Sequence, residues 1–154
     1  MKHDPVAALI SIPPLALAAH LPRLIFATLL MLVAATSVSQ SKEVPVTNTE
    51  DGGEGSLRQA IASASSGDTI TFSLPANSVI ALTDGSLSID KNLTINGPGA
   101  NQLTMARSRA EDTAKFRIFH IGAAGISAAI SGLTIANGDV GFGGDGGGVS
   151  NLGI

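Results

Sequence analysis

From Asp68 onward, short apolar runs follow one another along the chain, and Ser or Thr often separates their apolar residues. Alternation with a period of two predicts strands that bury one face, so that Ile70 and Phe72 share a side, as do Leu87 and Ile89. Gly, Asn, Asp and Pro residues lie between the runs and predict turns. The expected strands are residues 69–72, 79–82, 87–89, 93–95, 103–105, 116–121 and 129–135.

A helical period precedes these strands. Ser56 is followed three residues later by Gln59, which is a capping-box pattern at a helix start. The apolar positions that follow share one face at helical spacing; they are Leu57, Ala60, Ile61 and Ala64. Gly67 is placed to end the helix in a left-handed conformation. The pattern therefore predicts a helix over residues 56–65, preceded by a short extended piece at 44–49.

Strands this short are typical of two all-β arrangements, an antiparallel sandwich or barrel and a solenoid of stacked coils. Two similar phrases favour the solenoid, namely "NLTINGPG" (92–99) and "GLTIANGD" (132–139). Each contains Leu-Thr-Ile followed by a turn built on Asn-Gly. As successive coils about 40 residues apart, they fall within the period expected of stacked repeats. We therefore expect coils of three short strands each over residues 68–154.

Stacked coils would bring equivalent residues into contact. The expected stacked pairs are Leu93 with Leu133 and Ile95 with Ile135. Asn96 and Asn137 would form the corners, where asparagine tolerates a left-handed backbone. The first coil of a solenoid has an open apolar end, so we expect the helix 56–65 to cover it. Nothing after "GGGVSN" covers the last coil, which predicts self-association through this open C-terminal coil.

The composition predicts a core that contains few aromatic side chains. Of the 154 residues, 44% are hydrophobic but only 3% are aromatic, and there is no cysteine. Stability must then come from repetitive packing or from assembly, because no disulfide is possible. The net charge of −3 leaves no basic face that would follow nucleic acid, which excludes that class of partner.

The N-terminal segment has the layout of a secretory signal. Arg23 precedes the apolar run Leu24–Ala35, and small residues follow it, with Ser37-Val38-Ser39 as a plausible cleavage triplet. An uncleaved anchor is the alternative, because Val6–Ala19 is also apolar, but prolines interrupt that stretch. The run is shorter than the roughly 20 residues that span a bilayer. We expect residues 1–39 to be a cleaved signal and the only part that meets a membrane.

Several phrases together resemble a known group of proteins. They are "VTNTEDGGEGSLRQAI", "GDTITF", "LTINGPG", "ISGLTIANG" and "GGGVSN". Over residues 44–154 the chain resembles the N-terminal part of bacterial secreted right-handed parallel β-helix proteins, the polymorphic outer-membrane-protein-like and autotransporter-passenger-like group with a pectate-lyase-like fold. The resemblance implies an all-β, right-handed parallel β-helix with an N-terminal extended segment and capping helix at 40–67 and coils at 68–154. It also implies a secreted or outer-membrane-associated location, and a solenoid that is incomplete at its C-terminus.

A lyase of this fold would need clustered acidic Ca²⁺ ligands and a basic proton acceptor. The acidic candidates are Asp84, Asp90, Asp139 and Asp145, and the basic ones are Lys91, Arg107, Arg109, Lys115 and Arg117. None of them falls at a recognisable spacing, and most of the acidic ones belong to turn sequences. The cations between 107 and 117 are interspersed with acids, as in a solvated loop.

Three further features give no reason to expect a functional site. "GFGGDGGG" (141–148) is a single imperfect copy of a Ca²⁺-binding nonapeptide, and a loop explains it better. His120 is the only histidine after residue 39, so a zinc site is not expected, and no serine lies in a nucleophile-elbow phrase. Asn92-Leu93-Thr94 matches the short glycosylation pattern. We predict no catalytic, cofactor-binding or metal-binding residue.

Three functions are compatible with these features. The first is an extracellular or cell-surface scaffold, adhesin-like and without catalytic activity of its own, with glycans, surface proteins or further copies of itself as partners. The second is the N-terminal fragment of a polysaccharide lyase or hydrolase whose catalytic coils lie beyond Ile154. The third is a nonfunctional gene fragment. We favour the first, because the fold hosts many activities and no catalytic pattern is present.

Overall fold

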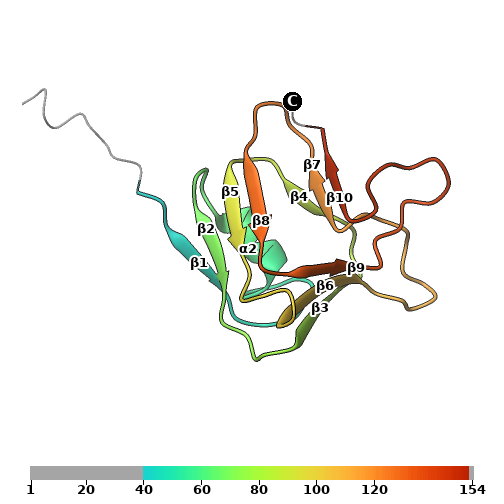
Figure 1. Ribbon diagram of the computed structural model, residues 1–154, viewed down its shortest axis with the longest axis horizontal. Coiled ribbons are helices and arrows are strands. Elements are labelled where there is room, and N and C mark those ends of the chain that lie inside the picture. Colours follow the sequence, from blue (N-terminus) through green and yellow to red (C-terminus); the bar gives the residue numbers. More distant parts are fainter. Residues whose placement is uncertain (1–39, 153–154) are drawn as a thin grey trace, which may run out of the picture. The chain divides into compact units, whose positions relative to one another are not determined.

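The computed structural model describes residues 40–152, and the predicted export signal at 1–39 lies outside the described residues. The described part contains ten strands and one short helix (Figure 1). They are β1 (Glu43–Val46), α2 (Leu57–Ser63), β2 (Thr69–Phe72), β3 (Ser78–Leu82), β4 (Leu87–Ile89), β5 (Leu93–Asn96), β6 (Leu103–Arg107), β7 (Phe119–Ile121), β8 (Ala128–Ser131), β9 (Thr134–Ala136) and β10 (Val149–Asn151).

The strands form three parallel sheets, ordered β1-β2-β5-β8, β3-β6-β9 and β4-β7-β10. From β2 onward the chain enters the three sheets in turn, and each strand pairs with the strand three places later. Figure 1 shows β2, β5 and β8 side by side in one sheet, with β3, β6 and β9 in another. The prediction of an all-β chain with one short helix is confirmed, and every strand pair within residues 40–152 is parallel.

The parallel register stacks residues of the same kind above one another. Thr69 pairs with Thr94, which lies 25 residues later, and Ile70 pairs with Ile95. Later pairs are further apart, as in Ala128, which lies 35 residues after its partner Leu93. The connecting loops therefore differ in length while the strands remain in register.

The core forms from alternate residues of all three sheets. In β4, Leu87 and Ile89 are buried and Ser88 between them is exposed. The same alternation occurs in β5, where Leu93 and Ile95 are buried. One buried cluster joins these side chains to those of the other sheets. Burial of aliphatic residues at about 25 cal/mol per Å² is the main stabilising contribution available to a core with so few aromatic rings.

The predicted helix is confirmed, with a shorter extent. The Gln59 backbone N–H donates to Ser56 Oγ at 3.2 Å, and this bond caps the N-terminus. All four stripe residues are buried; they are Leu57, Ala60, Ile61 and Ala64. The helix packs against β1 and β4, so it covers apolar residues at the beginning of the sheets. It ends at Ser63 with an extended Ala64 as C-cap, whereas Gly67 (φ +93°) lies in the turn before β2.

The expected stacking of the two Leu-Thr-Ile phrases is wrong. Leu93 pairs with Ala128, not with Leu133, and Ile95 pairs with Ile130. Ile135 belongs to a different sheet, where its partner is Met105. The two similar phrases therefore occupy different sheets.

The reason for this error is a corner inside residues 129–135, which the sequence pattern predicts as one strand. Gly132 has a φ of +64° and separates β8 from β9. Its Cα lies so close to Gly97 that a Cβ at position 132 would overlap the Gly97 carbonyl. Only glycine fits such a corner without strain. Asn137 is left-handed as expected (φ +58°), whereas Asn96 is the last residue of β5 and is not left-handed.

Candidate functional site

The acidic loop before α2 is tied to the sheets through Asp51. The Asp51 carboxylate accepts hydrogen bonds from Arg58 Nη2 at 2.6 Å and from the backbone N–H groups of Thr83 and Asp84, both at 2.7 Å. Burial alone would raise the pKa of Asp51, but these hydrogen bonds outweigh it and lower the pKa below the ordinary value. Arg58 also donates to the carbonyl oxygens of Gly85 and Ser86, both at 3.0 Å. Asp51 and Arg58 are therefore a structural pair that fixes the helix.

A cleft of about 390 Å³ lies between α2 and β4. Its lining residues are Arg58, Ile61, Ala62, Ser86, Leu87, Ser88, Asp90 and Lys91. The Lys91 ammonium donates to the Ile61 and Ala64 carbonyl oxygens at 3.3 and 3.2 Å, which neutralises the end of the helix. Arg58 and Lys91 both donate to carbonyl oxygens of the chain, so the two cations that line this cleft attach the helix to the sheets.

Another, smaller pocket lies between the loop that joins β6 to β7 and the loop that joins β9 to β10. It measures about 190 Å³ and is lined by Lys115, Asp139, Gly141 and Phe142. Asp139 Oδ2 lies 3.0 Å from Lys115 Nζ, and Asp139 Oδ1 accepts the Gly141 N–H at 2.8 Å. The Gly141 N–H and then the Lys115 ammonium hold the pKa of Asp139 below its ordinary value, so the carboxylate is ionised at neutral pH.

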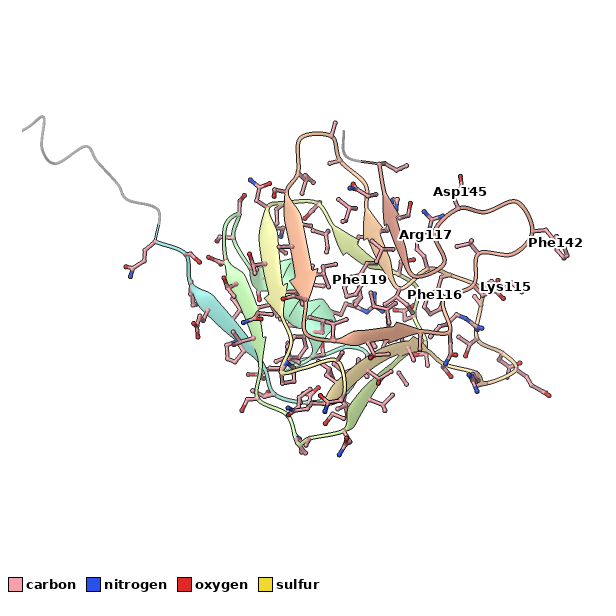
Figure 2. All side chains as sticks on the ribbon, viewed as in Figure 1. Lys115, Phe116, Arg117, Phe119, Phe142 and Asp145 are labelled. Carbon is pink, nitrogen blue, oxygen red and sulfur yellow. The ribbon has the colours of Figure 1, made fainter. Side chains whose placement is uncertain are left out.

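Phe142 is fully exposed beside this pocket. Figure 2 shows its ring at the outer end of the loop, directed away from the sheets, whereas Phe119 lies among them. Phe116 and Phe119 are buried, as apolar aromatic residues usually are. Sequence reasoning did not single out Phe142. The signal that marks it is one aromatic residue with glycines on both sides, in a loop without strand periodicity.

His120 lies in a row of polar residues across one sheet. It pairs with Ser88 of β4 on one side and with Ser150 of β10 on the other. Its Nδ1 atom is buried and has no hydrogen-bond partner. A serine–histidine pair in a hydrolase needs an acid that orients the imidazole through the second nitrogen. The row in this sheet therefore lacks the geometry of a triad.

The acidic candidates named from the sequence do not come together. Asp84 lies in the turn between β3 and β4, Asp90 follows β4, and Asp139 and Asp145 lie on the loop before β10. Within residues 40–152, no three His, Cys, Asp or Glu side chains are grouped so that they could hold a metal ion. The structure does bring Lys115 to Asp139, although no pattern in the sequence pairs these two residues.

Two of the basic candidates hold the corner after β9. Arg107 Nε donates to the Asn137 carbonyl oxygen at 3.0 Å, and Arg109 Nη2 donates to Asn137 Oδ1 at 2.8 Å. Both bonds fix the left-handed residue from which the Phe142 loop begins. These two cations therefore position a loop.

Comparisons with known proteins add no assignment. The chain matches no protein-family model, and no curated protein or solved structure shows significant similarity to it. In the part of the chain that the structure describes, no helix has the length and apolar character needed to cross a bilayer. Its function is therefore inferred from the residues and geometry given above.

Proposed function

We propose that this chain is an exported β-helix segment that acts as an extracellular or cell-surface scaffold, adhesin-like and without a reaction of its own. The observation that carries the proposal is the order of the strands. The chain enters three parallel sheets in turn, and each strand stacks on the equivalent strand of the preceding round. Repeated rounds of this kind build an elongated support whose outer surface displays side chains.

The three sheets are interpreted as the three sides of a right-handed parallel β-helix. All strand pairs among residues 40–152 are parallel. Between one strand of a sheet and the next strand of the same sheet, the chain passes through the other two sheets. Crossover connections between parallel strands are right-handed in about 98% of cases, which supports that hand here. Helix α2, packed against β1 and β4, is interpreted as the cap of the first coil.

Small hydroxyl side chains on the outer faces support a display function. Ser88 in β4 is exposed between two buried residues, and Thr94 and Thr104 hold similar positions in β5 and β6. Such residues alternate with buried residues along each strand and contribute little to the core. Loops between the strands can then differ in length and side chains without loss of the stacked core.

Export is supported by the sequence of the N-terminal segment. Arg23, the apolar run Leu24–Ala35 and the small residues after it have the order of a signal peptide. We propose a bacterial secreted or outer-membrane-associated location. Glycans or surface proteins would be the partners in that location.

Self-association is proposed through the strands at the end opposite β1. Among the described residues, β8 and β9 are the outermost strands of their sheets. Ile130, Leu133 and Ile135 are only half buried there. Unpaired strand edges with apolar neighbours favour pairing with another chain.

The proposal is tested by expressing the full chain in a Gram-negative host. Intact mass should show a shortened chain, cut near Ser39, in the extracytoplasmic fraction. The recovered protein should release neither reducing ends nor unsaturated products from pectate, alginate, xylan or glucan. A chain that stays in the cytoplasm with residues 1–35 intact would contradict the proposal. Cleavage of one polysaccharide would support the alternative, a fragment of a lyase or hydrolase.

A further inference from the structure

Phe142 presents an aromatic ring fully to solvent. Gly141 (φ +75°) and Gly143 (φ +80°) are both left-handed, and neither has a side chain that could cover the ring. A phenylalanine ring in water is an apolar surface that gains free energy when another group covers it. The chain has only five phenylalanines and neither Trp nor Tyr, so it is unusual that one of these few rings is fully exposed.

A hydrogen-bond donor and an acceptor lie beside this ring. The Lys115 side chain is 64% exposed, and within residues 40–152 its ammonium pairs with Asp139 Oδ2 alone. An ammonium has three N–H groups, so two remain directed to solvent. The Asp139 carboxylate is 37% exposed. Oδ2 accepts from Lys115 and Oδ1 accepts from the Gly141 N–H, which leaves acceptor capacity on both oxygens.

The Asp139 side of the pocket is attached to the core. The Asp139 N–H donates to the carbonyl oxygen of Phe116 at 3.0 Å, and Phe116 is itself buried. Asn137, two residues earlier, is fixed by Arg107 and Arg109. The carboxylate is therefore in place before any ligand arrives, which lowers the entropic cost of binding.

The two segments that line the pocket, residues 107–117 and 137–148, carry balanced charge. The cations of the two segments are Arg107, Arg109, Lys115 and Arg117, and the carboxylates are Glu111, Asp112, Asp139 and Asp145. Four charges of each sign give no field that would concentrate a polyanion. Balanced charge therefore favours an uncharged ligand.

The size of the pocket favours a single ring. Its volume of about 190 Å³ lies below the range of roughly 300–1,000 Å³ that holds drug-sized molecules. A hexose pyranose with equatorial hydroxyls has C–H groups on both faces, which suit the negative face of an aromatic ring. Its hydroxyl groups can accept from Lys115 and donate to Asp139. A membrane or a protein partner would need a larger apolar patch than one ring between glycines.

We propose that Phe142, Lys115 and Asp139 form a subsite for one pyranose ring of a neutral polysaccharide. Phe142 covers one face of the sugar, and the ion pair holds its hydroxyl groups. The inference rests on the proposed function, because a polysaccharide meets the chain only after export. It assigns the glycan contact of the scaffold to the loop between β9 and β10.

The test is a titration of the ¹⁵N-labelled chain, as recovered from the expressing host, with cellohexaose. We expect saturable shifts of the Gly141 and Gly143 amide signals. Phe142→Ala should weaken binding by about tenfold, since an aromatic contact is worth up to about 1.5 kcal/mol. Phe142→Tyr should keep the affinity. Val79→Ala is the matched control, because Val79 is also an exposed apolar residue but lies on β3.

Three results would overturn the inference: no shift in this loop at millimolar cellohexaose, equal binding by Phe142→Ala, or tighter binding of polygalacturonate than of cellohexaose. Shifts of the same amides with phosphatidylglycerol vesicles and not with cellohexaose would assign the ring to membrane contact and contradict it. An exported chain that fails to bind refutes this subsite and leaves the scaffold proposal intact. A chain that binds but is never exported supports the subsite and refutes the scaffold proposal.

Discussion

Asp51 Oδ1 and Arg58 Nη2 lie 2.6 Å apart and join the glycine-rich loop to the helix that it precedes. The same carboxylate accepts the N–H groups of Thr83 and Asp84, so one side chain holds the loop, the helix and the turn between β3 and β4. The Asp51 side chain is 14% exposed, and its hydrogen bonds are thus screened less than those of a surface pair. Attachment of the helix is polar on this side and apolar on the side that faces the core.

Replacement of Asp51 should destabilise the chain. Asp51→Ala leaves Arg58 and two backbone N–H groups without their acceptor, which is expected to cost about 2–3 kcal/mol. Urea unfolding followed by circular dichroism measures the difference. Glu50→Ala, which removes an exposed carboxylate one residue away, should change stability by less than about 0.5 kcal/mol. Equal midpoints for the two variants would show that the Asp51 bonds contribute nothing.

Acid should weaken the fold. The pKa values of Asp51, Asp68 and Asp139 lie below the ordinary 3.8, so the unfolded chain binds more protons than the folded one as pH falls. Their stabilisation is complete above pH 3.8 and is lost as pH falls through the folded pKa values. The thermal midpoint should be nearly constant from about pH 7 to 5 and should fall below about pH 4. Asp51→Ala should show a shallower fall, and a midpoint that rises on acidification would contradict the assignment.

The apolar face of the helix should tolerate no charge. Ile61→Asp would place a carboxylate in the core without a partner, which is expected to cost at least about 3 kcal/mol. Gln59→Asp is the matched control, because position 59 is exposed on the same helix. Arg58→Ala is not a neutral control, although Arg58 lies off the apolar stripe, because its guanidinium bonds to Asp51, Gly85 and Ser86. Similar thermal midpoints for Ile61→Asp and Gln59→Asp would mean that the helix does not cover the core.

The corner at Gly132 should be sensitive to a single methyl group. Gly132→Ala adds a Cβ that would overlap the Gly97 carbonyl and also strains a left-handed residue. Gly125→Ala is the control, because Gly125 is also left-handed (φ +77°) but a Cβ there meets no atom within 4 Å. We expect Gly125→Ala to cost about 1 kcal/mol and Gly132→Ala clearly more. Equal losses in chemical denaturation would show that contact with Gly97 is unimportant.

Charge at the outermost strands should prevent self-association. Ile130→Lys places a charge at a half-buried position on β8, and lysine at a strand edge opposes pairing. Sedimentation velocity should show association of the unchanged chain at tens of micromolar and monomers for Ile130→Lys. Val79→Lys, at an exposed position on β3, should behave as the unchanged chain does. An unchanged chain that is monomeric at these concentrations would refute association through this edge.

The helix and the strands could be predicted from the sequence, but the pairing of the strands with one another could not. The helix is visible because its cap at Ser56 and its apolar stripe are local patterns. The strands are visible for the same reason, since buried and exposed residues alternate within each of them. Register was predicted wrongly, because every short strand has the same period and only the corner at Gly132 shows that Leu93 faces Ala128.

The candidate site was even harder to predict from the sequence, because the fold brings together residues that are far apart along the chain. The pairing of Lys115 with Asp139 joins two loops separated by β7, β8 and β9, and no local pattern connects them. Phe142 lies between two glycines, and the one apolar residue close to it, Val140, makes a pattern too short for periodicity to assign the ring to a core or to a surface. Only its exposure beside the pocket distinguishes it from a packed aromatic residue.

The most direct test of the account is a measurement of cross-strand contacts by NMR on the labelled chain. The parallel three-sheet arrangement predicts nuclear Overhauser contacts between the methyl groups of Ile70 and Ile95 and between those of Ile95 and Ile130. It also predicts contacts between Met105 and Ile135, with no close Hα–Hα contacts across any strand pair. Contacts between Leu93 and Leu133, or the short Hα–Hα distances of antiparallel strands, would contradict it.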